Sequence, residues 1–184
     1  EIYIPNLCYM DMLEHPPASC RLCFVEIEGR AQPVPSCQVE VVENMVVKTD
    51  TPAVRQLQQT ALELLLSVHH VDCGHCPANK KCELQKIARF LKVGLKPKRL
   101  KTFLKDQETM GDHPFLNHHP NRCVLCGKCI QVCRKTHGVP FMDFADRGFA
   151  TIISFYGPQR PDAVLCEQCL ACVEICPVGA ITLK

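Results

Sequence analysis

This sequence of 184 residues lacks several features by which enzymes and membrane proteins are usually recognised. It has no tryptophan and only 6% aromatic residues, which suits small domains better than one large hydrophobic core. Its apolar runs are too short for a helix that spans a bilayer, and no signal segment opens the chain. Neither G-x-G-x-x-G nor a P-loop occurs, so no nicotinamide, flavin or nucleotide site is predicted. What the chain has in abundance is cysteine, with fifteen residues.

Eight of these cysteines form two runs of identical spacing, with gaps of two, two and three residues, and Pro177 directly follows the second run. Two-cluster ferredoxins hold two cubane 4Fe–4S clusters in this way, and the fourth cysteine of each run ligates the other cluster. Zinc is the alternative, because C-x2-C pairs also bind that ion, but four cysteines per run favour clusters. We therefore predict one cubane on Cys123, Cys126, Cys129 and Cys176, and another on Cys166, Cys169, Cys172 and Cys133.

A middle group consists of His69, Cys73, Cys76 and Cys82. Three cysteines are one ligand short of a cubane, and a histidine at this distance completes the set. We predict a third 4Fe–4S cluster here with His69 as the fourth ligand, although the spacing alone leaves His70 as an alternative. His75, between two of the cysteines, is predicted to be a solvated loop residue.

The first group, Cys8, Cys20, Cys23 and Cys37, has a lone cysteine, a close pair and a distant fourth. This arrangement has the broad shape of a 2Fe–2S loop, although its gaps differ from the plant-type spacing. On spacing alone a zinc knuckle or free buried thiols remain alternatives.

The segments around these groups resemble one family. They read IPNLCY and CRLCFVE at the first group, LELLL and ELQ beside the second, and RCVLCGKCIQVCR at the third. They are similar to the large iron–sulfur subunit of respiratory complex I, a module that also occurs in NAD-linked hydrogenases and formate dehydrogenases. The complete double cubane run points toward the latter two relatives. One departure is Pro17-Ala18-Ser19 before Cys20, where the family usually has a glycine, which permits positive φ.

The resemblance implies an α+β protein of three cluster-binding parts. Residues 1–50 would form a β-grasp 2Fe–2S domain whose N-terminal part is missing, because only seven residues precede Cys8. Residues 51–94 would form a helical domain with the histidine-ligated cluster, and residues 95–121 a linker. Residues 122–184 would form the two-cluster ferredoxin domain. The implied cofactors are one 2Fe–2S and three 4Fe–4S clusters.

Local patterns predict the secondary structure. Strands are expected at Phe24–Ile27 and Val39–Val42, and a hairpin between the two cubane runs at 147–156. A helix should begin at Thr51-Pro52 and end near His69, with one apolar face made of Val54, Leu57, Ala61, Leu64, Leu65 and Val68. A second helix should run from Cys82 to Val93 and be ended by Gly94, with a face made of Leu84, Ile87, Ala88 and Leu91.

The stretch 86–105 is rich in basic residues and contains no acid. It is either a docking or charge-compensating face or simply a solvated surface, and it lacks the features of a nucleic-acid site. Its members are Lys86, Arg89, Lys92, Lys96, Lys98, Arg99, Lys101 and Lys105. The nearby His113, His118 and His119 are predicted to be solvated loop residues.

These observations predict an electron carrier without substrate chemistry of its own, because no open metal position or acid–base pair is evident. The resemblance implies a subunit that relays single electrons between a flavin- and NAD(P)H-binding iron–sulfur subunit and a hydrogenase catalytic subunit. A formate dehydrogenase or complex I-like partner is the alternative, and a zinc-stabilised interaction module is the alternative from another class. Cluster thiols require a reducing compartment, so we expect a cytoplasmic location.

Overall fold

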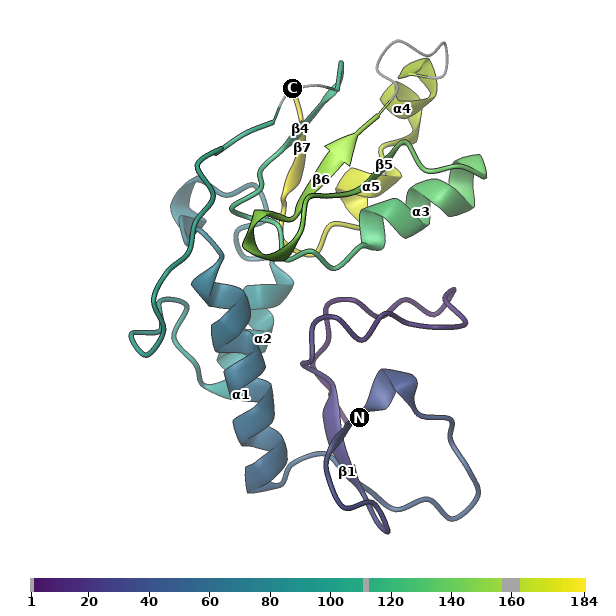
Figure 1. The fold of residues 1–184 in the computed structure, drawn as a ribbon, viewed down its shortest axis with the longest axis vertical. Coiled ribbons are helices and arrows are strands. Elements are labelled where there is room, and N and C mark those ends of the chain that lie inside the picture. The colour runs from purple at the N-terminus through teal and green to yellow at the C-terminus, as the bar shows by residue number, and fades with distance from the viewer. Residues whose placement is uncertain (1, 111–112, 157–162) are drawn as a thin grey trace.

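The computed structural model describes residues 2–110, 113–156 and 163–184. Figure 1 shows two helices side by side, an N-terminal segment beside them, and a C-terminal unit of helices and short strands at one end. The helices are α1 Pro52–Ser67, α2 Glu83–Leu91, α3 Lys128–His137, α4 Ala163–Cys169 and α5 Ala171–Glu174. The strands are β1 Phe24–Ile27, β2 Val34–Pro35, β3 Val47–Lys48, β4 Leu116–His118, β5 Met142–Ala145, β6 Ile152–Phe155 and β7 Ile181–Leu183.

The N-terminal segment has a small antiparallel sheet in the order β2-β1-β3. Strand β1 lies where it was predicted, and its alternate residues Val25 and Ile27 are buried. The strand predicted at Val39–Val42 is wrong: this stretch is a loop in which the Val41 side chain is 89% exposed. Because β2 and β3 already flank β1 on both sides, β1 has no free edge with which residues 39–42 could pair.

Helix α1 begins as the sequence predicts, with Pro52 in its first turn and the Thr51 hydroxyl accepting a hydrogen bond from the Val54 N–H. Its apolar face differs in part from the prediction. Val54 and Ala61 are buried, but so is Gln58, whose side-chain amide donates to the Phe24 carbonyl. The buried leucines of this helix are Leu62 and Leu66.

The predicted face residues Leu57 and Leu64 of α1 point away from the core and are exposed. Together with Phe103 and Phe149, whose rings stack 5.1 Å apart, they line an apolar groove of about 610 Å³. Helix α1 therefore has apolar residues on two sides, and this is why its periodicity alone identified the buried side only in part.

Helix α2 begins directly after Cys82 and buries the predicted face of Leu84, Ile87, Ala88 and Leu91. It ends earlier than predicted, because Lys92 adopts a left-handed conformation with φ 55° and its N–H returns to Ala88 and Arg89. Gly94 is therefore not the residue that ends the helix.

The segment expected to be a linker runs along α1 toward the C-terminal unit (Figure 1). The Phe103 N–H donates to the Ser67 carbonyl at 2.8 Å, and the Arg99 side chain forms an ion pair with Glu63 of α1. The Asn121 side chain accepts from the Lys105 N–H and donates to the Lys105 carbonyl. The segment also contains strand β4, which pairs with β7 from the end of the chain.

The C-terminal unit combines this β4–β7 pair with a hairpin, β5 and β6, and with helix α3 against α5. The hairpin predicted between the cysteine runs is confirmed, although its first strand begins at Met142. Each helix carries part of one cysteine run, so the packing of α3 on α5 brings the two runs together.

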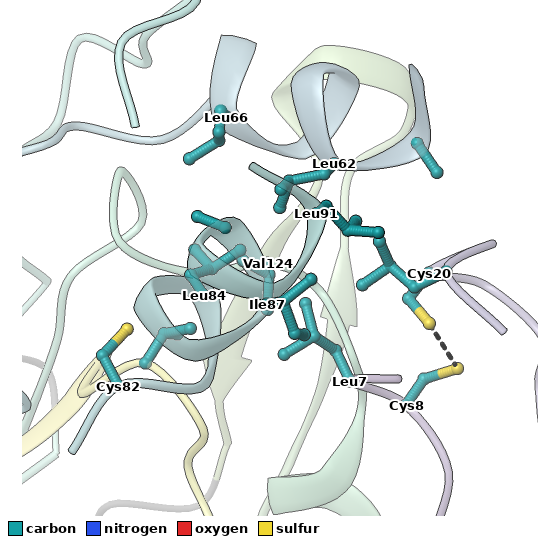
Figure 2. Close-up of a cluster of buried hydrophobic side chains, with 14 of the residues drawn as sticks. Leu7, Cys8, Cys20, Leu62, Leu66, Cys82, Leu84, Ile87, Leu91 and Val124 are labelled. Carbon is teal, nitrogen blue, oxygen red and sulfur yellow. Dashed lines mark hydrogen bonds between the residues drawn. The ribbon is translucent and has the colours of Figure 1, made fainter. Parts of the chain in front are cut away.

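Buried apolar side chains form two cores. Among the described residues, the helical core joins α1 and α2 to the N-terminal segment and contains fifteen buried residues, of which Figure 2 labels Leu7, Leu62, Ile87 and Val124. The described part of the C-terminal core has seven: Leu116, Cys129, Ile130, Met142, Ile153, Cys172 and Ile181. Over the described ranges, no helix combines the length and apolar character required to cross a bilayer.

Candidate iron–sulfur sites

The first cysteine group gathers at the edge of the helical core. Cys8, Cys20 and Cys23 are 1–4% exposed, and the sulfurs of Cys8 and Cys20 lie 3.4 Å apart, as the dashed line in Figure 2 shows. The hydrogen bond between these two sulfurs lowers the pKa of Cys8 to about 5 and raises the pKa of Cys20. Burial, followed by the charges of Cys23 and Cys8, raises the pKa of Cys37 to about 12. All four predicted residues are thus electrostatic neighbours.

The loop that carries this group contains left-handed backbone without glycine. Ala18 has φ 50°, where the related family usually has glycine nearby, and Arg21, between Cys20 and Cys23, has φ 54°. Non-glycine residues adopt this conformation at a cost, and such residues concentrate at functional sites. Leu125 and Leu170 have similar φ values inside the other cysteine runs.

The middle group lies on a short turn and a helix start. Cys73 begins a 3-10 turn that ends at His75, and Cys82 is the residue before α2. Burial raises the pKa of Cys82, and the charges of Cys76 and Cys73 add to the shift, so the three thiols are neighbours. His75 is confirmed as a solvated residue: its side chain is 86% exposed and its Nδ1 lies 2.9 Å from Asp72.

The two candidate histidine ligands differ in burial. The Nδ1 of His69 is buried without a hydrogen-bond partner, and desolvation lowers the pKa of this imidazole to about 4. His70 is exposed, and its backbone N–H donates to the Asn121 carbonyl. A neutral imidazole with an unused nitrogen has the donor chemistry that a metal ligand needs. His69 therefore fits the requirement better than His70 does.

The third group lines one small cavity in the C-terminal unit, formed by Cys123, Cys126 and Cys129 from the first run and by Cys176 from the second. Burial raises the pKa of Cys123 to about 12 and that of Cys126 to about 11, and nearby thiols, Cys176 among them, add to both shifts. The structure thus places Cys176 beside the three cysteines of the first run with which it was predicted to share a cluster.

The fourth group, made of Cys166, Cys169, Cys172 and Cys133, likewise combines three cysteines of one run with one cysteine of the other. Burial raises the pKa of Cys172 to about 12, and the charges of Cys133, Cys166 and Cys169 raise it further. Cys133 belongs to the first run by sequence, yet it interacts electrostatically with Cys169 of the second. Its position at the inner face of α3 explains this, because α3 packs on α5, which carries Cys172.

Backbone amides point at three of the thiol sulfurs. The Leu125 N–H donates to Cys123 at 3.4 Å, the Phe141 N–H to Cys133 at 3.3 Å, and the Ala180 N–H to Cys176 at 3.2 Å. Hydrogen bonds to a sulfur favour its thiolate form, which is the form that binds iron. These residues therefore suit ligands of an iron–sulfur cluster.

The loops of the middle and third groups touch each other. The Glu83 N–H donates to the Pro177 carbonyl at 2.9 Å, and the Cys76 sulfur lies 3.8 Å from the Val178 carbonyl. Gly179 approaches Ala78 so closely that an added Cβ would sit 2.9 Å from the Ala78 Cβ. The ligand loop that precedes α2 is thus joined to the loop that follows Cys176.

In the part of the chain that the structure describes, no three histidine, cysteine or acidic side chains surround a single metal position.

Two histidines near these sites were misjudged from the sequence. His118 was expected to be solvated, but its ring is fully buried and lines the same cavity as Cys123 and Cys176. His113 is also buried, at 5% exposed. Strand pairing causes the difference at His118, because its position in β4 turns it inward beside Leu116, and only the alternation of these two residues in the sequence could have signalled it.

Three family models match the chain in sequence order. Residues 1–52 match a 2Fe-2S iron-sulfur cluster binding domain, and residues 58–95 match the NADH-ubiquinone oxidoreductase-G iron-sulfur binding region. Residues 113–182 match the ferredoxin-like domain of NADH-quinone oxidoreductase subunit 3. The fold and its matches define an iron–sulfur protein with 2Fe–2S- and 4Fe–4S-binding regions in series.

Full-length comparisons give particular relatives. The chain is 32% identical over 183 residues to the NADH-ubiquinone oxidoreductase 75 kDa subunit of Reclinomonas americana, covering 100% of this chain and 26% of that protein. It is 32% identical over 188 residues to NADP-reducing hydrogenase subunit HndD of Solidesulfovibrio fructosivorans, covering 98% of this chain and 31% of the relative. The chain therefore spans about a quarter to a third of these relatives.

A solved structure extends the similarity to the fold. An NAD+-reducing NiFe-hydrogenase in its H2-reduced state superposes with a TM-score of 0.80 at 28% identity, covering 99% of this chain and 76% of the hydrogenase chain. The predicted resemblance to complex I-type and NAD-linked hydrogenase iron–sulfur subunits is confirmed by these findings.

Proposed function

We propose that this chain is an electron-transfer part of an NAD(P)-linked oxidoreductase and holds one 2Fe–2S and three 4Fe–4S clusters. The 2Fe–2S ligands are Cys8, Cys20, Cys23 and Cys37. The 4Fe–4S ligands are His69, Cys73, Cys76 and Cys82 at one site, Cys123, Cys126, Cys129 and Cys176 at a second, and Cys166, Cys169, Cys172 and Cys133 at a third.

The observation that carries the proposal is the cavity of the C-terminal unit. Three cysteines spaced two residues apart line it together with Cys176, a residue 47 positions beyond Cys129 in the sequence. A zinc knuckle needs no such exchange between distant runs, whereas paired cubanes do. The electrostatic coupling of Cys172 to Cys133 supports the reciprocal half of the arrangement.

The chain's own residues prepare these sites for electron transfer rather than for substrate chemistry. When bound, iron–sulfur clusters supply reversible one-electron oxidation and reduction. The thiolates would hold the irons, backbone amides such as that of Ala180 would stabilise the sulfur charge, and buried side chains such as Ile153 and Val178 would exclude water. Four sites with a full ligand set leave no open position for a substrate.

The relatives support a partner of a particular kind. Their names include an NADP-reducing hydrogenase and an NAD+-reducing hydrogenase. We therefore propose a flavin-bearing NAD(P)H subunit at one end of the relay and a hydrogenase catalytic subunit at the other. The relative in Reclinomonas americana supports the second candidate, a complex I-like dehydrogenase, and a formate dehydrogenase partner remains in the same class.

Iron analysis and reduction assays test the proposal. Protein prepared without oxygen should contain about fourteen irons per chain. It should be reduced by dithionite but not by NADH, and adding the flavin-bearing subunit of its complex should restore reduction by NADH. A colourless protein that contains zinc in place of iron would refute the cluster assignment, and rapid reduction of the flavin-free chain by NADH would refute the relay.

The histidine ligand is tested by a matched pair of variants. His69→Ala should loosen or remove one cubane, whereas His70→Ala should leave it intact. His69→Cys should keep the cluster and lower its potential, because a thiolate adds negative charge to the site. If His70→Ala alone removes the cluster, the ligand is His70.

A further inference from the structure

His118 is a buried polar residue whose side chain makes no hydrogen bond in the described structure. Its side chain is 0% exposed, and neither Nδ1 nor Nε2 has a partner. Buried ring nitrogens without partners are costly, and native proteins rarely retain them. The ring therefore needs a partner that the protein atoms alone do not supply.

The surroundings of the ring limit what that partner is. His118 lines the cavity of Cys123, Cys126, Cys129 and Cys176. The rest of the lining consists of apolar side chains, among them Ile153, Val178 and Ile181, and of Lys128, whose ammonium group cannot accept a hydrogen bond. Among the side chains that line this cavity, the cysteine sulfurs are therefore the acceptors available to a ring N–H.

The ring is also held firmly in this position. The His118 N–H donates to the Met110 carbonyl at 2.9 Å, and the Met110 N–H donates back at 2.7 Å. On the other side His118 is paired with Ile181 of β7. With both edges of its strand occupied, the backbone cannot turn the side chain out to solvent without breaking the β4–β7 pair.

We propose that the His118 ring donates an N–H hydrogen bond to a sulfur of the cubane in this cavity and thereby raises the reduction potential of that cluster. The inference rests on the cluster assignment proposed above. An imidazole carries at least one N–H in either protonation state, so a donor is always available. Hydrogen bonds to the sulfurs favour the more negative, reduced state, and this raises the potential. His118 is a positioning residue that acts on the cluster without ligating iron.

The proposal distinguishes this cubane from the one on Cys166, Cys169, Cys172 and Cys133. A backbone amide, that of Phe141, points at a sulfur of that second site, but the cavity that His118 lines belongs to the first site alone. The side chain of His118 therefore makes the first cubane the easier of the two to reduce, other contributions being equal.

Redox titration of the complete chain, followed by EPR, tests this directly. His118→Leu keeps the size and burial of the side chain but removes the donor, and it should lower the potential of one cubane. His118→Gln restores an N–H and should return the potential toward the wild-type value. His113→Leu, which replaces another buried histidine away from this cavity, should shift no cluster.

The outcomes separate this inference from the proposed function. A wild-type protein without this cubane would overturn the proposed function itself. Full iron content with an unchanged potential in His118→Leu would overturn only the hydrogen bond. If His118→Leu fails to assemble the cluster, recovery of both cluster and potential in His118→Gln supports the donor role, whereas loss in both variants shows that the ring is needed for folding alone.

Discussion

The helical core and the C-terminal core differ in what fills them. Of fifteen buried residues in the helical core, three are cysteines, and leucine and isoleucine side chains of α1 and α2 make up much of the rest. Among the residues whose burial the structure describes, the C-terminal core has seven, and two of them, Cys129 and Cys172, are proposed ligands.

From this difference we expect the two halves to depend to different degrees on the clusters proposed for them. The described part of the C-terminal core buries little apolar surface, so we expect metal binding to contribute to the folding free energy there. The α1–α2 pair has its own apolar contacts, and the sheet of the N-terminal segment packs against α1. Each proposed C-terminal cluster also takes one ligand from the other run, Cys176 or Cys133, so cluster binding would hold the two runs together.

The largest expected effect follows from removing all iron with a chelator under anaerobic conditions. Amide protons of β4, β7 and α3 should lose their protection, whereas those in the middle of α1 should remain protected, because the α1–α2 contacts survive. Hydrogen exchange followed by mass spectrometry measures both regions in one sample. Equal loss of protection in both would show that the helical core is no more independent than the C-terminal one.

A matched pair of core variants sharpens the same comparison. Leu62→Ala should lower the free energy of unfolding by about 2–5 kcal/mol, through lost burial and the cavity that remains, but should leave the cluster spectra unchanged. Ile130→Ala, at a side chain equally buried between Cys129 and Cys133, should cost a similar amount and also reduce the iron content. Chemical denaturation and iron analysis check the two variants. Loss of iron in Leu62→Ala but not in Ile130→Ala would contradict this expectation.

The contact between the loop that precedes α2 and the loop that follows Cys176 should make stability sensitive to substitution at Gly179. Its φ of 64° and the 2.9 Å approach of an added Cβ to Ala78 make Gly179→Ala unfavourable by about 2–4 kcal/mol. Gly29→Ala is the control, because Gly29 also has positive φ but no atom within 4 Å of an added Cβ, and it should cost only about 1–2 kcal/mol. Thermal unfolding of both holo-proteins gives the difference.

The smallest effect is expected at Ala18 in the first cysteine loop. Ala18→Gly removes the strain of a left-handed residue but increases the conformational entropy of the unfolded chain. We therefore expect the free energy of unfolding to rise by about 0.5 kcal/mol. Ala31→Gly, at an exposed position without positive φ, has no strain to relieve and should lose about 0.5 kcal/mol. Opposite signs in denaturant titrations are the expected result.

Much of this arrangement could be predicted from the sequence because cysteine spacing is a strong constraint. The apolar periodicity and the Thr51-Pro52 pair are signals within short stretches of sequence, and α1 and α2 lie close to where these signals predict them. The ligand sets remain predictions, and the grouping of Cys176 with the first run is consistent with them.

The remainder depended on tertiary contacts that no local pattern records. Val39–Val42 has the composition of a strand, yet the edges of β1 were already occupied. Leu57 and Leu64 fit helical periodicity, but they face a groove rather than the core. His118 is polar and lies in a segment rich in proline and histidine, and only its pairing with β7 places it inside the protein.

The hydrogen bond from the Glu83 N–H to the Pro177 carbonyl has an electronic consequence. Cys82 precedes the donor and Cys176 precedes the acceptor, so a path of covalent bonds with a single hydrogen bond joins a thiol of the middle group to a thiol of the third. Both groups in this hydrogen bond belong to the main chain. Electrons that tunnel between the two proposed clusters would therefore have a bridge that does not depend on the side chains at positions 83 and 177. Among natural residues only proline at position 83 would remove its donor.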